Sequence, residues 1–398
     1  MKRFFCIIVT LSMLFVLVAA CATDSAPAAP TDAPAAAAPA DTPATTAPAD
    51  DTGGSEDGFR VGFSHVYVGN AWRVQYVEGI EAAFQEYIDM GVLAEFSITD
   101  ADNDITTQLN QLNLMLNSGY DAIIINPVSP TALGPFIREA QERGVLIVNN
   151  NDLMAFEGVY SIGTDFTVYT QIQVDYLASK LPNQSGNLVG VTGFDGNSTV
   201  EIHLKALERK ISEEFPGLNM LAMASGEWSD AGAQTTMSNF LAAFPEIDAV
   251  YTHDGMTMGI INAFRNAGRD LVPMGGDYFK AFIDFWDDNR DLESVIIANS
   301  PQAVGASGVH LAMGLLMGKT VNRDLLIPNP LDESLVNFIA MPPSCVVFRD
   351  PATEAPFMVN YPHVTVLSLD EIVDKMRGLP ETAAINIPFA ALSVLFDD

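Results

Sequence analysis

The sequence predicts an α/β protein made of two doubly wound parallel-sheet lobes joined by a hinge. From residue 58 onward, short and nearly continuous apolar runs alternate with helical stretches, as expected for parallel strands covered by helices on both faces. The same alternation starts again in the second half of the chain. This region spans about 340 residues, which is more than one hydrophobic core usually holds, so two lobes are expected.

Residues 1–20 are predicted to be a secretory signal peptide. Lys2 and Arg3 precede an uncharged apolar run that extends from residue 4 to residue 20 and closes on small residues. This layout is typical of a targeting segment rather than of a fold element. The run is also about as long as a short membrane span, so an uncleaved anchor is the alternative interpretation.

The stretch Val18-Ala19-Ala20-Cys21 resembles a bacterial lipobox. The resemblance implies that the mature chain begins at Cys21, which carries lipid on its sulfur and anchors the protein on the outer side of the cell membrane. The residues that follow, up to residue 57, contain no lysine, arginine, aromatic or large aliphatic side chain. We therefore expect residues 21–57 to form a disordered tether of Ala, Pro, Thr and Asp.

The number of cysteines and the net charge argue against two further classes, disulfide-linked proteins and nucleic-acid-binding proteins. Cys6 leaves with the signal and Cys21 is lipidated, so Cys345 has no partner for a disulfide and is expected to be a buried thiol with no metal-binding role. Without Lys2 and Arg3, 17 basic residues oppose 50 acidic ones, which gives a net charge near −33. This charge repels phosphate backbones, so nucleic-acid binding is not expected.

The expected N-terminal lobe comprises residues 58–164 and 300–328. Its strands are predicted at 59–65, 95–99, 122–126, 145–149 and 159–163. The helical stretches between them carry apolar side chains on one face, as at Leu109, Leu112 and Leu116.

The expected C-terminal lobe comprises residues 165–299 and 329–398. Its strands are predicted at 188–192, 220–224, 249–252, 272–275 and 295–299. In the tail, residues 366–380 are predicted to form a helix and 383–389 a loop or an edge strand, and we expect both to pack on this lobe. The hinge is expected at residues 163–165, at 299–302 and after about residue 328.

Polar and aromatic residues follow the predicted strands directly, and ligands on doubly wound sheets bind at the carboxyl ends of the strands. The candidate ligand-binding residues are Asn70, Trp72, Arg73, Asn150, Asn151, Asp152, His203, Trp228, His253, Asp254, Asp277 and Asn299. Indole faces cover the C–H face of a sugar ring, and carboxylates and amides bind adjacent hydroxyls. The set predicts a polyhydroxylated ligand, although Trp72 and Trp228 would also suit structural positions and Asp277 would suit a helix N-cap.

Five stretches carry a family resemblance. GNAWRVQYVEGIEAAF, DAIIINPVSPTALGPFIREAQERGVLIVNNN, AVYTHDGMTMGIINAFRNAG, the GGD that ends at Asp277 and ANSPQAVGASGVHLAMGLLMGK resemble, in this order, the ribose-binding branch of the type I periplasmic solute-binding proteins. The resemblance extends from about residue 59 to residue 319. It implies that Asn70, Trp72 and Arg73 reach the sugar from the first lobe. It also implies that Asp277 is the sugar-binding aspartate and Asn299 the amide at the hinge.

The chain departs from this pattern at several positions. Asn151 and Asp152 stand where the family often has an Asp-Arg pair, and His203 stands where arginine is common. Trp228 matches a stacking aromatic, and Asp254 lies near a position that is often Asn. The missing arginines leave the identity of the sugar open, while the architecture is unaffected.

The resemblance implies a lipid-anchored, extracytoplasmic solute-binding protein of an ABC importer, a monomer without cofactor that delivers a monosaccharide or related polyol to a membrane permease. A receptor for a sensory system is the alternative. A secreted glycoside hydrolase is a weaker one, because neither a G-x-S-x-G nor an H-E-x-x-H motif is present. A sugar-responsive repressor is disfavoured, since a signal peptide occupies the place of its DNA-binding domain.

Overall fold

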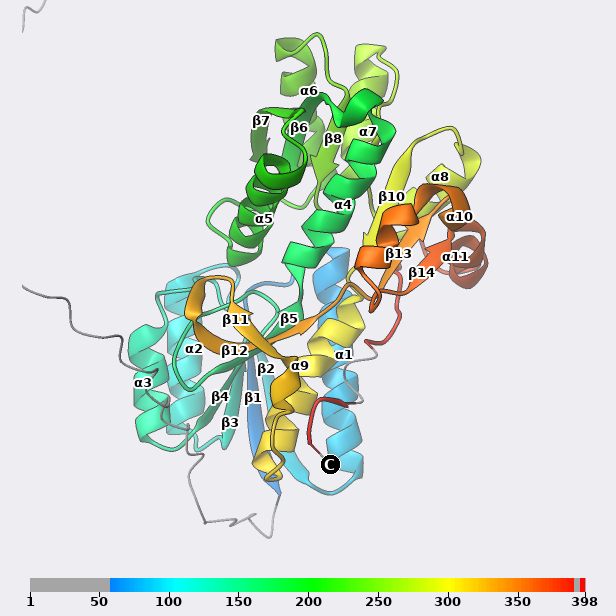
Figure 1. The fold of residues 1–398 in the computed structure, drawn as a ribbon. Coiled ribbons are helices and arrows are strands. Elements are labelled where there is room, and N and C mark those ends of the chain that lie inside the picture. Colours follow the sequence, from blue (N-terminus) through cyan, green and yellow to red (C-terminus); the bar gives the residue numbers. More distant parts are fainter. Residues whose placement is uncertain (1–57, 390–393, 398) are drawn as a thin grey trace, which may run out of the picture. The chain divides into compact units, whose positions relative to one another are not determined.

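The structure is a computed structural model, which describes residues 58–389 and 394–397. The predicted signal peptide, the lipidation site Cys21 and the predicted tether lie outside the described residues. The described chain contains two seven-stranded, largely parallel sheets with helices packed against them, which confirms the predicted two-lobed α/β fold (Figure 1). Within these residues, no helix has both the length and the apolar character needed to cross a membrane.

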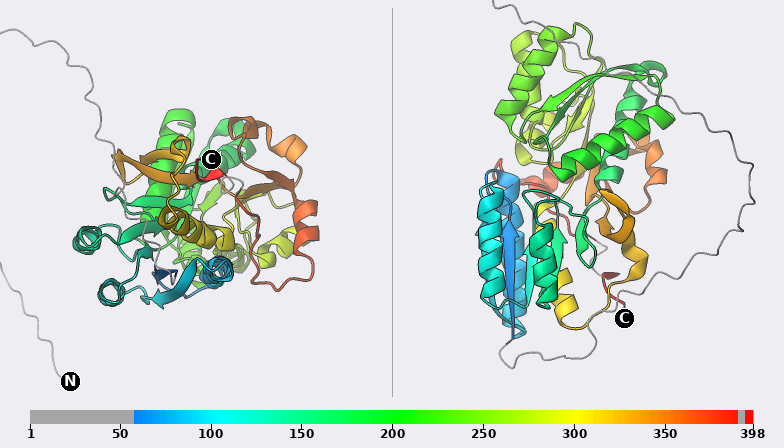
Figure 2. Two further views of the ribbon diagram at one scale, coloured as in Figure 1. Left: turned by 90° about the horizontal axis from the view of Figure 1, so that it is seen from below. Right: turned by 90° about the vertical axis from the view of Figure 1, so that its left-hand side faces the viewer.

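The first lobe contains a sheet in the order β11-β12-β5-β4-β3-β1-β2. Its strands are β1 (Phe59–His65), β2 (Leu93–Asp100), β3 (Ala122–Ile125), β4 (Leu146–Asn150), β5 (Tyr160–Thr164), β11 (Leu326–Asn329) and β12 (Asp332–Met341). Its helices are α1 (Ala71–Asp89), α2 (Ile105–Asn117), α3 (Gly134–Glu142) and α9 (Pro301–Leu316), with the short η2 (Arg323–Leu325). Helices α1 and α9 cover one face of this sheet, and α2 and α3 cover the other (Figures 1 and 2).

Two glycines allow α1 and α9 to pack with their backbones in contact. A Cβ atom at Gly79 would lie 2.2 Å from the carbonyl oxygen of Gln302, and one at Gly305 would lie 2.4 Å from that of Tyr76. Any larger residue at either position would therefore push the helices apart. This close packing fixes the start of α9, two residues after Asn299.

The second lobe contains a sheet in the order β14-β13-β10-β9-β8-β6-β7. Its strands are β6 (Gly186–Thr192), β7 (Leu218–Ser225), β8 (Ala249–Thr252), β9 (Met274–Gly276), β10 (Ser294–Ala298), β13 (Cys345–Phe348) and β14 (Val366–Ser368). Its helices are α4 (Phe166–Lys180), α5 (Ser198–Glu214), α6 (Asp230–Ala243), α7 (Thr257–Ala267), α8 (Lys280–Asp288), α10 (Pro351–Glu354) and α11 (Leu369–Met376), with η1 (Pro182–Gln184) and η3 (Pro356–Asn360). Helix α4 packs beside α5, while α6 packs on α7 and α8 on α11.

The chain passes from one sheet to the other between β5 and α4, between β10 and α9, and between β12 and β13. The first two crossings lie where the sequence predicted them. The third lies after Met341 instead of after residue 328, so β12 belongs to the first lobe and the predicted boundary requires correction. Residue 328 lies in β11, and the chain turns at Pro330 and Leu331 in a hairpin: β12 runs back antiparallel to β11 and pairs in parallel with β5.

A C-terminal segment contacts both lobes, and we call residues 380–389 and 394–397 the strap. The backbone N–H of Ile385 donates to Tyr278 O in the second lobe, and that of Ile387 donates to Ser300 Oγ at the start of α9. Its end pairs with the first lobe, where Phe396 forms an antiparallel bridge with Val321. The strap therefore packs on both lobes, whereas the sequence predicted that the tail would pack on the second alone.

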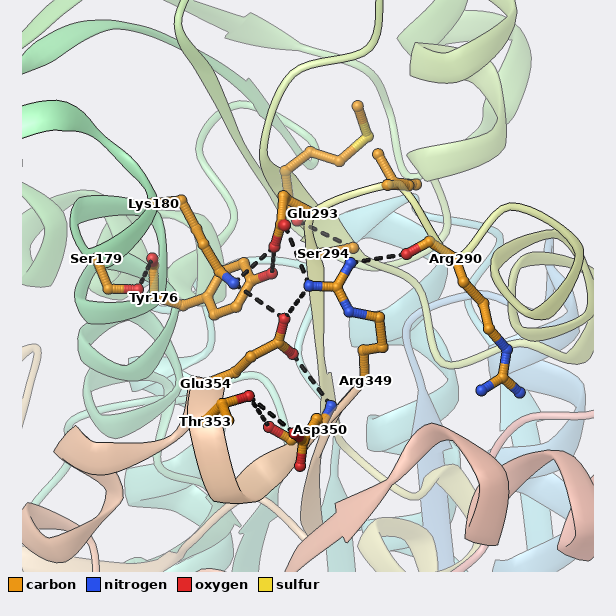
Figure 3. Close-up of polar contacts among 12 residues, drawn as sticks. Tyr176, Ser179, Lys180, Arg290, Glu293, Ser294, Arg349, Asp350, Thr353 and Glu354 are labelled. Carbon is orange, nitrogen blue, oxygen red and sulfur yellow. Dashed lines mark hydrogen bonds and ion pairs between the residues drawn. The ribbon is translucent and has the colours of Figure 1, made fainter.

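A ring of four alternating charges attaches β13 and α10 to the rest of the second lobe (Figure 3). Lys180 Nζ lies 2.6 Å from Glu293 Oε2 and 3.0 Å from Glu354 Oε1. Arg349 Nη2 closes the ring, at 3.1 Å from Glu293 Oε1 and in contact with Glu354. Because Glu354 is only 5% exposed, this network replaces solvation that the carboxylate loses on folding.

Candidate ligand-binding site

Two adjoining pockets lie where the carboxyl ends of the strands of both lobes face each other. The arginine pocket, of about 30 Å³, is lined by Tyr67, Asn70, Trp72, Arg73, Asn151, Asp152, Phe166, Thr199, Trp228, Asp254 and Asn299. The acidic pocket, of about 270 Å³, is lined by Asn70, Ala71, Trp72, Trp228, Ser229, Asp230, Asp254, Gly255, Met258, Asp277, Phe279, Ala281, Phe282, Glu381 and Thr382. They share residues of both lobes, so they form one continuous cleft whose larger part is close to the lower limit of about 300 Å³ for small-molecule sites.

The first turn of α1 positions Arg73 beneath the arginine pocket. Asn70 caps this helix, because its side-chain oxygen accepts a hydrogen bond of 2.9 Å from the Arg73 backbone. The guanidinium donates to Asn126 Oδ1 at 2.9 Å and to Asp152 Oδ2 at 3.0 Å. The one guanidinium predicted to bind ligand is therefore held in a buried ion pair within its own lobe.

Asp152 links the two lobes. Besides Arg73 and Asn126, its carboxylate accepts a 2.9 Å hydrogen bond from Thr199 Oγ1, which lies in the first turn of α5 in the second lobe. Burial opposes ionisation of this group, but Arg73 and the two other donors together hold the pKa of Asp152 below its usual value. The carboxylate is therefore ionised at neutral pH and fully engaged by protein donors.

Trp72 forms the floor of the cleft where the lobes meet. It is 6% exposed, its ring stacks on Tyr76 with centroids 5.1 Å apart, and its Nε1 donates to Asn299 O at 3.2 Å. Asn299 is itself held by a hydrogen bond from Thr164. Two residues at separate hinge crossings, Thr164 and Asn299, are thus connected to the aromatic floor.

Trp228 covers the cleft from the second lobe in an unusual backbone conformation. Glu227 and Trp228 have φ angles of +60° and +47°, a left-handed conformation that costs free energy in residues other than glycine. The indole lies over Gly193, where a Cβ atom would come within 2.2 Å of the ring. With this backbone conformation the indole lines both pockets.

Carboxylates dominate the second-lobe wall. Asp254 Oδ2 accepts a 2.9 Å hydrogen bond from Tyr278, whereas Asp277 Oδ1 has no hydrogen-bond partner in the described part of the chain. Burial, reinforced by the charges of Asp254 and Asp230, raises the pKa of Asp277 well above its usual value. Burial also raises the pKa of Asp254. Asp277 Oδ1 is therefore left for a hydrogen-bond partner that the described residues do not supply.

Most of the predicted site residues meet in this cleft. The pockets are lined by Asn70, Trp72, Arg73, Asn151, Asp152, Trp228, Asp254, Asp277 and Asn299. Asn151 reaches the pocket in a left-handed conformation, with φ of +69°, and its Oδ1 has no partner among the described residues.

Asn150, His203 and His253 line neither pocket. Asn150 points from β4 toward α1 and α9, where its side chain accepts from Tyr76 and donates to Ile162 O, Val304 O and Ser307 Oγ. Because side chains of a strand alternate between the faces of the sheet, this amide is fixed among the helices rather than at the strand end. Its role is structural.

The two histidines are buried inside the second lobe. Their rings stack with centroids 4.0 Å apart, and His203 Nδ1 hydrogen-bonds with Thr170 at 2.7 Å. His203 lies one turn beyond Thr199 along α5, about 6 Å deeper in the lobe. Burial lowers the pKa of His203, and it lowers that of His253 to about 3, so both rings are neutral.

Several lining residues were not predicted from the sequence. Tyr67 and Thr199 follow β1 and β6 closely, and the rule that selected the other post-strand residues would also have found them. Glu381 and Thr382 belong to the strap, which reaches the acidic pocket because Lys280 and Ala281 donate backbone hydrogen bonds to Ala383 O and Glu381 O. A local sequence pattern does not predict a contact between segments about 100 residues apart.

Residues 61–320 match the family model described as a periplasmic binding protein domain. The chain belongs to this family. Its two sheets, its hinge crossings and the position of the cleft between the strand ends agree with that assignment. Among the described residues, no group of three or more His, Cys, Asp and Glu side chains is arranged to hold a metal ion.

Curated relatives of this periplasmic binding protein include the xylitol-binding protein of Mycolicibacterium smegmatis. It is 29% identical over 283 residues, which cover 69% of this chain and 77% of the relative. The ribose import binding protein RbsB of Bacillus subtilis is 25% identical over 282 residues, covering 70% and 88%. These similarities extend over most of each relative.

Solved structures share the fold. An ABC transporter solute binding protein from Thermobispora bispora superposes with a TM-score of 0.63 at 21% identity, covering 83% of this chain and 99% of that one. A second, from Bacillus halodurans with bound myo-inositol, gives a TM-score of 0.60 at 22% identity, covering 72% and 94%. The first alignment is long enough to include part of the chain beyond residue 320.

Proposed function

We propose that this chain is the lipid-anchored, extracytoplasmic solute-binding protein of an ABC importer and captures a monosaccharide or related polyol between its lobes. The observation that carries the proposal is the cleft itself, in which two indoles, several amides and several carboxyl groups face one small volume. One buried carboxylate oxygen there, Asp277 Oδ1, has no partner among the described residues. Apolar ring faces and hydrogen-bond acceptors in this combination suit a compact polyhydroxylated molecule. The names of the xylitol- and ribose-binding relatives support the same ligand class.

Binding would act through the hinge. A ligand that contacts both walls favours the arrangement in which the walls approach each other, so it shifts the lobes toward closure. Trp72 and Asn299 would sense the ligand beside the crossings, while Asp277 would hold it from the second lobe. A permease in the cytoplasmic membrane would then bind the closed form. No catalytic step is part of this function.

A thermal-shift screen tests the ligand class. Purified protein would be heated with pentoses, hexoses, linear polyols and cyclitols, and calorimetry would follow on any compound that raises the melting temperature. A ligand that binds only the native state at one hundred times its Kd stabilises it by about 2.7 kcal/mol. Failure of every sugar and polyol to bind, or turnover of a glycoside by the purified protein, would contradict the proposal.

The lipid anchor has its own test. Replacement Cys21→Ala removes the only thiol that the lipobox resemblance assigns to acylation. The variant should move from the membrane fraction to the soluble fraction and lose incorporation of labelled fatty acid, with ligand binding unchanged. A variant that stays in the membrane with the same label would contradict lipidation at this position.

A further inference from the structure

The acidic pocket carries negative charge without a matching cation. Asp230, Asp254, Asp277 and Glu381 line it, and none of its lining residues in the described chain is a lysine or an arginine. The adjoining arginine pocket contributes one guanidinium, that of Arg73, which Asp152 already neutralises at 3.0 Å. The cleft as a whole is therefore anionic where the ligand would sit.

Asp277 supplies an independent observation. Its side chain is 4% exposed and lines the acidic pocket, yet its Oδ1 has no hydrogen-bond partner within the described residues. A buried carboxylate oxygen without a donor costs free energy comparable to a lost hydrogen bond. The position is therefore built to receive a donor from the ligand.

A neutral ligand hydroxyl would donate a hydrogen bond to Asp277, but it would not compensate the negative charge of the carboxylates around it. Asp254 and Asp230 act electrostatically on Asp277, so closure around a neutral ligand would leave like charges together in a site from which water has been removed. An ammonium group compensates these charges and donates as many as three hydrogen bonds. The Trp72, Trp228 and Phe279 rings that line the same pocket also favour a cation over their faces.

We propose that the cleft selects a sugar or polyol that carries a protonated amino group, with the ammonium held by Asp277 and Asp254 at the aromatic wall. The hydroxyls of the same molecule would face the amides and indoles of the arginine pocket. This inference rests on the proposed function, because it names a narrower ligand class for the same site. A polyol without an amino group would then bind as the weaker analogue.

Matched ligand pairs test the inference by calorimetry on the purified protein. The pairs are D-glucosamine with D-glucose, D-galactosamine with D-galactose, and amino-deoxy-inositol with myo-inositol. N-acetyl-D-glucosamine serves as a further control, because it keeps the nitrogen but loses the charge. At least one aminated compound should bind roughly tenfold or more tightly than its neutral partner, since charge-assisted hydrogen bonds are about twice as strong as neutral ones.

Substitutions test which carboxylates are responsible for the preference for an aminated ligand. Asp277→Asn and Asp254→Asn keep the shape of each side chain but remove its charge, and each should reduce the preference for the aminated ligand by roughly tenfold. The control variant is Asp288→Asn, which alters an exposed aspartate at the end of α8 in the same lobe and should leave the preference unchanged.

Three results would overturn the inference. Equal or tighter binding of the neutral partner in every pair would refute the amino preference and leave the proposed function standing. If no sugar or polyol bound, aminated or not, both the amino preference and the proposed function would be contradicted. Stabilisation by calcium chloride alone, lost in Asp277→Asn, would assign the carboxylates to a metal ion instead.

Discussion

Thr199 of the second lobe donates a 2.9 Å hydrogen bond to Asp152 of the first, and this bond spans the cleft. Arg73 and Asn126 both donate to Asp152 Oδ2, so the carboxylate keeps its cation when Thr199 is lost, while Oδ1 loses the donor that joins it to the second lobe. Thr199→Val should therefore weaken ligand binding by roughly tenfold, the value of one hydrogen bond to a charged group. Calorimetry measures the affinity, and small-angle scattering reports whether the unliganded protein is more open.

The matched control for this bond is Thr235→Val. Thr235 is exposed on α6, where its hydroxyl donates to Ala231 O of the same helix. If Thr199→Val and Thr235→Val bound the ligand with equal affinity, the contact with Asp152 would have no role in closure.

Trp72 serves the fold as well as the cleft. Its ring stacks on Tyr76 and is only 6% exposed, so Trp72→Ala should lower the free energy of unfolding by about 3 to 5 kcal/mol, the usual cost of truncating a large buried aromatic residue. Trp72→Phe keeps a stacking ring but loses the hydrogen bond to Asn299 O, and it should cost clearly less. Denaturant titration compares the two, and equal stability of Trp72→Ala and the parent would show that the ring is dispensable for folding.

Asp277 should make the unliganded protein less stable as pH rises. Burial raises the pKa of Asp277 above its unfolded value of 3.8, so the folded state holds this proton more tightly. Stability is then lost as pH increases from about 4 through the folded pKa, by about 1.4 kcal/mol for each unit of difference. Asp277→Asn removes this penalty, so at neutral pH the variant should melt at a higher temperature than the parent.

The same comparison at a pH well below 3.8 provides the control, because Asp277 is protonated there in both states and the two proteins should differ little. Asp288→Asn, at an exposed position, should melt at the same temperature as the parent at neutral pH. A lower melting temperature of Asp277→Asn at neutral pH would mean that the charge stabilises the fold.

The charged ring should contribute to the stability of the second lobe. Glu354→Gln removes the negative charge that both Lys180 and Arg349 contact, and it leaves two cations sharing Glu293. We expect a loss of about 1 to 3 kcal/mol in the free energy of unfolding. Asp374→Asn breaks the pair with Arg377, in which both side chains are more than 70% exposed, and should cost less than about 0.5 kcal/mol. Equal effects would mean that the ring contributes no more than a surface pair.

The positions of the apolar strands along the chain could be predicted from the sequence because they are local signals. The run Ala122–Ile125 is buried along its whole length, and every strand predicted up to residue 299 is present in the structure within a few residues. The third crossing was misplaced because Pro328 indicates a chain break but not whether the break turns within a sheet or leaves it. That choice depends on the pairing of β12 with β5, between segments about 180 residues apart.

The candidate site was found in outline because strand ends meet at the same edge of a parallel sheet. The rule identifies residues near the strand ends, but it does not show how deeply a side chain is buried or which way it points. It selected Asn150, whose side chain points to the helices, and His203, which lies too deep. It also could not reveal that Arg73 and Asp152 pair with each other, since both were expected to contact the ligand.

Because the strap forms part of the acidic pocket, the order in which the chain is synthesised determines when the pocket can be completed. Glu381 and Thr382 complete one wall of the acidic pocket, and they are synthesised after every other residue that lines it. The Gln75 side chain donates to Thr382 O and accepts from the Ala384 backbone N–H, so it joins segments about 310 residues apart. Such distant contacts form late in folding. Both sheets can therefore form before the pocket is complete. A chain shortened at residue 379 should lack that wall, and it should also be less stable because Ile385, Phe389 and Leu395 are buried in the hydrophobic core.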